Sequence, residues 1–174
     1  KIQPILRNME DIERAAGAMV KSGFFRDTTQ VAQAAVKIMA GSELGFGPFA
    51  SMTGVHIIQN KTVLSANLLA AAIKQTGRYN FRVTKHSDTE CEITFYEYFN
   101  GKWESAGVSV FDWEDAKKAQ LVGKDNWQKY PRNMLFARAL SNGQKWYAPD
   151  VFNGATVYTP DEMGAQVDEE GNVI

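Results

Sequence analysis

Aromatic and cationic residues are interleaved between Trp127 and Tyr147, in the segment WQKYPRNMLFARALSNGQKWY. Aromatic rings can stack on bases and fixed positive charges can neutralise phosphates, so this mixture suits a single-stranded nucleic acid. Pro131 fits the first turn of a helix, where its missing N–H costs nothing. We therefore expect a helix from Pro131 that presents Arg132 and Arg138 away from the core. An ordinary amphipathic helix with a solvated basic face and structural tryptophans is the alternative interpretation.

The candidate binding residues are cations and aromatics of this segment and its approaches, together with one cation at the tip of an expected hairpin. A stacking role is predicted for Trp127 or Tyr130, and a core anchor explains Trp127 as well. The predicted nucleic-acid-binding residues are Lys61, Lys124, Trp127, Lys129, Tyr130, Arg132 and Arg138.

Few residues could support catalysis. His56 falls in a strand-like run and His86 precedes a turn, and neither has the spacing of a metal ligand pair. Cys91 is expected to be a small buried strand residue. The GxSxG elbow and both glycine-rich phosphate loops are missing from the sequence. We therefore expect no catalytic residue, no metal, no cofactor and no enzyme activity.

The composition is ordinary for a soluble globular chain, with 44% hydrophobic and 22% charged residues. A single cysteine forbids an internal disulfide. The sequence has no apolar run of about 18 residues that could span a bilayer, and no signal peptide is visible at its start. We expect a cytoplasmic protein without membrane contact.

The charge is unevenly distributed along the chain. The last fourteen residues hold five acids and no base, which leaves 19 basic and 15 acidic residues in 1–160, a net charge of +4. A basic body suits a nucleic-acid binder, and the acidic end could recruit a partner, compete with the ligand or simply be solvated. We expect a single DNA-binding domain over residues 1–160 and an acidic, flexible tail over residues 161–174.

Apolar spacing and turn residues predict an α+β fold. It has N-terminal helices, a small hairpin and helix, an antiparallel sheet of at least three strands, and then the C-terminal basic helix. In chain order, we expect a helix over 9–21, a second helix capped by Thr28 or Thr29, a glycine-rich turn over 43–49, a hairpin over 55–64, a helix over 66–75, strands over 79–86, 90–98 and 102–110, and a helix over 113–119.

The aromatics of the strand over 90–98 have two interpretations. Tyr96 and Tyr98 could form a stacking platform like that of sheet-based RNA binders. Glu92 and Glu97 accompany them, however, and would repel phosphate. Core packing and a cross-strand pair with Trp103 are therefore the preferred explanation.

Two runs resemble a known family: GSELGFGPFASMTGVHIIQNKTVLSANLLAAAIKQTG, and WQKYPRNMLFARALSNGQKWYAPDVF after the strands. Their order is similar to that of the RecT-like group of phage and prophage single-strand DNA-annealing recombinases. The matching positions of the basic helix are Trp127, Met134, Ala137, Arg138, Ala139, Leu140 and Pro149.

The resemblance implies an oligomer that binds single-stranded DNA and pairs it with a complementary strand in phage-type recombination, without ATP. It also implies partners such as an exonuclease or a host single-strand-binding protein. A non-enzymatic protein-interaction module of phage origin is the alternative.

Overall fold

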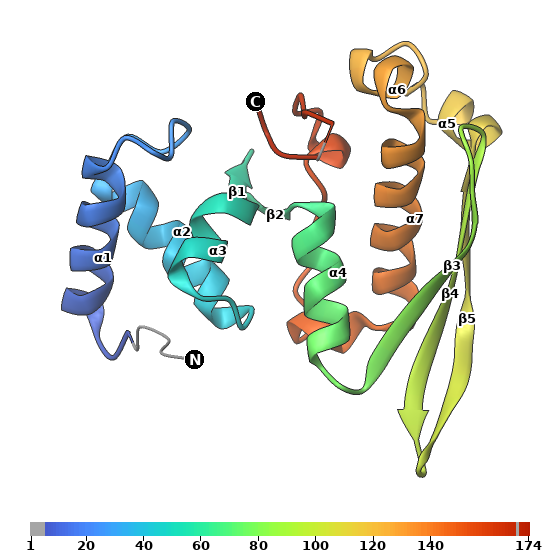
Figure 1. Cartoon of the computed structure of the whole chain (residues 1–174), viewed down its shortest axis with the longest axis horizontal. Helices are drawn as coiled ribbons and strands as arrows, with labels where there is room; N and C mark the ends of the chain where they lie inside the picture. The colour runs from blue at the N-terminus through green and yellow to red at the C-terminus, as the bar shows by residue number, and fades with distance from the viewer. Residues whose placement is uncertain (1–5, 170) are drawn as a thin grey trace. The chain divides into compact units, whose positions relative to one another are not determined.

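The computed structural model describes residues 6–169 and 171–174 (Figure 1). It confirms the α+β architecture, with N-terminal helices, a two-stranded sheet, a three-stranded antiparallel sheet and a C-terminal helix. The chain groups into two compact units, Lys1–Val63 and Leu64–Ile174, where we expected one domain over residues 1–160. Among the described helices, none has the length and apolar character needed to cross a bilayer.

The first unit contains α1 (Met9–Lys21), α2 (Val31–Glu43), α3 (Pro48–Gly54), the hairpin strand β1 (Val55–Ile58) and all but the last residue of its partner β2 (Lys61–Leu64). Asn8 caps α1, because its Oδ1 accepts a hydrogen bond from the Asp11 N–H at 2.9 Å. Apolar residues of the three helices, among them Ala16, Ile38 and Met52, form the core of the unit together with Phe25.

Two expectations for this unit need correction. The second helix begins at Val31, after Gln30, and neither Thr28 nor Thr29 caps it. The Thr28 hydroxyl instead accepts a hydrogen bond from the Lys37 ammonium at 3.2 Å. The expected turn over 43–49 runs directly into α3, which Pro48 starts from the first helical position.

The second unit contains α4 (Ala66–Gln75), β3 (Tyr79–His86), β4 (Glu90–Phe99), β5 (Lys102–Asp112), α5 (Trp113–Lys118), α6 (Asp125–Lys129), α7 (Pro131–Tyr147) and two short 3-10 helices, η1 (Pro149–Phe152) and η2 (Asp161–Met163). The strand order is β3-β4-β5, and all pairs are antiparallel. The predicted Asn100-Gly101 hairpin turn is confirmed, since both residues have the positive φ that a type I′ turn requires. The basic helix begins at Pro131, as predicted.

The two faces of the sheet differ in character. Ile93 and Phe95 of β4 are buried, and α7 packs against this side of β4 and β5 (Figure 1). Gly143 allows α7 to approach, because a Cβ atom there would lie only 2.0 Å from Cε2 of Phe95. Within the unit Leu64–Ile174, no described helix packs on the opposite face, which we call the open face.

β5 carries one extra residue, a β-bulge. Phe95 pairs with Gly107 and Tyr96 pairs with Ser105, so Ala106 between them has no partner in β4. Beyond the bulge, Tyr98 lies opposite Trp103.

Candidate nucleic-acid interface

Trp127 belongs to the core of the second unit. Its side chain has no solvent exposure, and its ring lies against Phe111 and Trp113 at centroid distances of 6.0 and 6.3 Å. Its Nε1–H donates a hydrogen bond to Oδ1 of Asp161 at 2.9 Å. A ring held in this way cannot stack on a base, so the core-anchor interpretation describes Trp127.

Arg138 does not point into solvent, as we had expected of it. Its side chain is 19% exposed, and its Nε lies 3.4 Å from Oδ2 of Asp161. The guanidinium also lies over the ring of Phe111, 6.0 Å from its centroid. One buried carboxylate therefore binds both Trp127 and Arg138 and ties the C-terminal segment to α6 and α7.

The other predicted residues of this segment remain at the surface. Lys124 is exposed at the start of α6, and Tyr130 is half-buried between α6 and α7. Lys129 and Arg132 are exposed and form ion pairs with Asp125 at 2.8 Å and with Asp88 at 3.1 Å. The structure thus brings four predicted residues together around α6 and the first turn of α7. Lys61 is exposed at the start of β2, in the other unit.

The beginning of the expected acidic tail is fixed to α7. Glu162 accepts hydrogen bonds from the Ser141 hydroxyl, the Thr159 N–H and the Lys145 ammonium, each at 2.7 Å. Burial alone would raise the pKa of Glu162, but these bonds and the charge of Lys145 hold it below its ordinary value. The contacts of Glu162 differ from the flexible tail that we expected over residues 161–174. Another acid of this segment, Glu170, lies outside the described residues.

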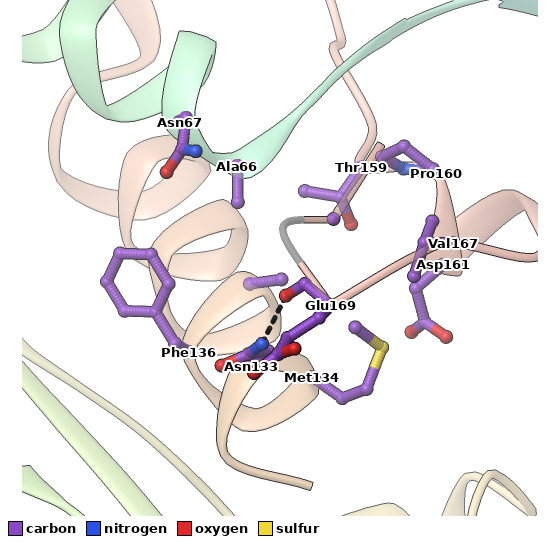
Figure 2. Close-up of a pocket in the computed structure, with 12 residues that line it drawn as sticks. Ala66, Asn67, Asn133, Met134, Phe136, Thr159, Pro160, Asp161, Val167 and Glu169 are labelled. Carbon is purple, nitrogen blue, oxygen red and sulfur yellow. Dashed lines mark hydrogen bonds between the residues drawn. The ribbon is translucent and has the colours of Figure 1, made fainter. Parts of the chain in front are cut away.

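A pocket of about 220 Å³ lies between α4, α7 and the C-terminal segment (Figure 2). Figure 2 shows Met134, Phe136 and Val167 around it, and most of its lining is apolar. The carboxylate of Asp161, also on its wall, is already bound to Trp127 and Arg138. Glu169 also lies on the wall, and its backbone carbonyl oxygen accepts a hydrogen bond from Asn133.

Of the remaining residues with catalytic potential, His86 and Cys91 are cross-strand partners on β3 and β4, and His56 belongs to the first unit. His56 contacts Asp27 in the first unit, with Nδ1 at 3.4 Å from Oδ2, and the Nε2 atom of His86 contacts the Arg132 carbonyl oxygen at 3.0 Å. Burial, together with the charge of Glu90, raises the pKa of the Cys91 thiol to about 12, so this thiol is not a nucleophile at neutral pH. No cluster of three or more histidine, cysteine or acidic side chains suited to a metal ion occurs in the described residues.

The open face displays aromatic rings. Tyr98 and Trp103 lie opposite each other on β4 and β5, with ring centroids 5.3 Å apart, and both are 46% exposed. Their cross-strand pairing is as expected, but the preferred explanation by core packing does not hold for this pair. The sequence signal was present, because Tyr96 and Tyr98 alternate with the buried residues of β4 up to Phe95.

The two acids that argued against a platform, Glu92 and Glu97, have partners nearby, and so has the neighbouring acid Glu104. Glu97 pairs with Arg78 at 2.6 Å, and Glu104 pairs with Lys102 at 2.8 Å. Glu92 accepts a hydrogen bond from the Thr84 hydroxyl. Local cations therefore offset part of the negative charge around the aromatic rings.

The edge strand β3 connects the open face with the cations around α6. Arg82 and Lys85 lie on β3, opposite Thr94 and Glu92 of the open face. Asp88, in the turn that follows β3, binds Arg132 of α7. Arg82, Lys85 and Arg132 thus form a row of cations, here called the cationic edge, which runs from the aromatic rings to the first turn of α7. Lys85 Nζ lies 3.5 Å from Oε1 of Glu90 and 3.9 Å from Oε1 of Glu92, so Arg82 is the cation of this row without an ion pair within the described residues.

Comparisons with known proteins identify no relative. No protein-family model, no curated protein and no solved structure matches this chain.

Proposed function

We propose that this chain binds single-stranded DNA with little sequence preference and anneals it to a complementary strand, as an ATP-independent oligomer of phage-type recombination in the cytoplasm. The resemblance to RecT-like proteins motivates the biological setting. The residues at the surface of the second unit support the binding step, and they are the basis of the argument that follows.

The exposed Tyr98–Trp103 pair carries the proposal. Large aromatic side chains normally gain free energy by burial, so two adjacent rings left half in solvent indicate a contact surface. Every base has a flat face, so such rings bind single strands of any sequence, with roughly 1–3 kcal/mol per stacked base.

The cationic edge supplies the electrostatic part. A phosphate can replace Asp88 as the partner of Arg132, because an exposed ion pair contributes only about 0–1 kcal/mol. Arg82 has no ion-pair partner within the described residues and can meet a phosphate directly. A strand that crosses the open face would therefore find stacking surfaces and charge neutralisation side by side.

Annealing itself needs no catalytic group, since base pairing with the second strand supplies the free energy. The surface only has to hold one strand extended and release it as it pairs. Binding by several copies along one strand would raise the effective concentration of each contact.

One observation favours the alternative of a protein-interaction module. Phe24 and Phe49 of the first unit are 68% and 58% exposed, with their ring centroids 6.0 Å apart. Such a pair fits a contact with another protein, and a second copy of this chain is included in that class.

Binding to a fluorescent oligothymidylate, measured by anisotropy from low to high salt, tests the proposal. We expect tight binding at low salt that weakens linearly on a log–log plot, with a slope of about −0.7 for each phosphate contact. Mixing with the complementary strand, without nucleotide triphosphates, should then accelerate duplex formation. Absence of binding at low salt would refute the proposal and leave the interaction module.

A further inference from the structure

The open face contains a hollow of about 310 Å³, lined by Asn80, Arg82, Tyr96 and Trp103. The four residues come from all three strands: Asn80 pairs directly with Tyr96, and Trp103 is on β5. Its volume is at the lower end of the range for small-molecule sites. The hollow could therefore take one small group rather than a folded surface.

The hydrogen-bonding groups that line the hollow favour an acceptor-rich ligand. The Asn80 Oδ1 atom already accepts a hydrogen bond from the Phe81 N–H at 2.8 Å, which leaves its Nδ2 donors unused. Within the described residues, the Arg82 guanidinium, the Tyr96 hydroxyl and the Trp103 indole N–H have no hydrogen-bond partner either. All four side chains offer free donors, and none is an acid.

A nucleotide combines the features that these donors and rings require. Its base is flat and carries carbonyl oxygens and ring nitrogens as acceptors, and its phosphate is an anion that a guanidinium binds with a forked pair of donors. Aromatic rings at the rim provide a stacking surface for the base.

We infer that this hollow takes one unpaired nucleotide of the bound strand, with its base against Trp103 and its phosphate at Arg82. The inference rests on the proposed single-strand binding and identifies the substrate class of the open face. A base in a duplex is already stacked and paired, and its extrusion costs a few kcal/mol. The hollow therefore selects single strands, and it must release its nucleotide when the second strand pairs.

The test compares an oligothymidylate with the same strand carrying abasic sites, which keeps every phosphate and removes bases. Wild-type protein should bind the intact strand about tenfold more tightly, the value expected for one stacked base. Trp103→Ala should weaken binding of the intact strand by about that factor and lose most of the preference for the intact over the abasic strand. Trp146→Ala is the matched control, since Trp146 is also exposed and lies on α7, away from the hollow.

Charge is tested separately from stacking. Arg82→Gln should lower affinity for both strands, and more than Lys118→Gln, which removes an exposed cation of α5 that has no ion pair within the described residues. Binding to a duplex of the same sequence should change little in Trp103→Ala, so the preference for single strands should fall. Thermal unfolding of each variant checks that the fold is intact.

The outcomes separate this inference from the proposed function. If wild-type protein binds the oligothymidylate but Trp103→Ala keeps the preference for intact over abasic strands, the nucleotide site is refuted and single-strand binding stands. Equal binding of both strands by wild-type protein would also refute the site alone. If wild-type protein binds neither strand at low salt, the proposed function fails and the site with it.

Discussion

Replacing Gly143 by alanine tests the packing of α7 on the sheet, on which the open face depends. The new Cβ would lie 2.0 and 2.5 Å from Cε2 and Cζ of Phe95. Carbon atoms pack best at about 3.5–4.0 Å, so the helix or the ring would have to move by roughly 1.5 Å. Phe95 is buried between Phe81 and Tyr147, with ring centroids at 6.1 and 5.8 Å, and has little room to turn away.

The magnitude follows from two opposing effects. Alanine gains about 1 kcal/mol over glycine inside a helix. Overpacking a tight core costs about 1–3 kcal/mol, and the short distances at Gly143 favour the upper end. We therefore expect a net loss of about 2 kcal/mol in the free energy of unfolding. Gly17→Ala in α1 is the matched control, because no atom lies within 4 Å of its added Cβ, and it should gain up to about 1 kcal/mol.

Denaturant unfolding with two probes measures both effects. All four tryptophans belong to the unit Leu64–Ile174, so tryptophan fluorescence reports the effect of Gly143→Ala, whereas far-ultraviolet circular dichroism also covers α1. If Gly143→Ala were as stable as the wild type while Gly17→Ala was stabilised, α7 would not press on Phe95 and the assignment of the two sheet faces would be wrong.

Three further changes give distinct expectations. Lys37→Met should lower the unfolding free energy of the first unit by about 3 kcal/mol or more, because the buried ammonium binds three oxygen atoms. Denaturant unfolding followed by circular dichroism measures this loss, and an unchanged unfolding free energy would contradict it. The folded state holds the pKa of Glu162 below its ordinary value of 4.5 through Lys145, so the protein should lose stability as the pH falls below about 4.5. Glu162→Gln should be less stable at neutral pH. Thermal melting at a series of pH values should show that this variant lacks this part of the acid sensitivity. Arg132→Ala should reduce the slope of log affinity against log salt concentration by about 0.7. Arg138→Ala should lower stability and leave this slope unchanged. The reverse pattern would place the DNA on the opposite side of α7.

Local signals in the sequence were sufficient for most of the fold. Proline at the first helical position marks Pro131, the Asn100-Gly101 pair fixes a hairpin, and alternation of side chains places the strands. These patterns involve neighbours in the chain, so periodicity and turn chemistry reveal them.

The partners of Trp127 and Arg138 could not be predicted in the same way. Both side chains bind Asp161, which follows them by more than twenty residues in a segment whose acidic composition is typical of a solvated tail. Composition cannot distinguish an acid in solvent from one that neutralises a buried donor. The aromatic platform was visible in the alternation of β4, but the partners that neutralise its acids come from other strands and loops.

The β-bulge at Ala106 decides which side chain of β5 reaches the open face. Side chains of a strand alternate between faces, so one residue more or less inverts everything that follows. If Ala106 paired in register with Tyr96 instead of bulging out, Glu104 would lie opposite Tyr98 and Trp103 would turn to the helix side. A related chain without a residue at position 106 would reach the Tyr98–Trp103 pairing in a regular strand. A chain of the same length that pairs this residue in register would lose the platform, even where the tryptophan itself is retained.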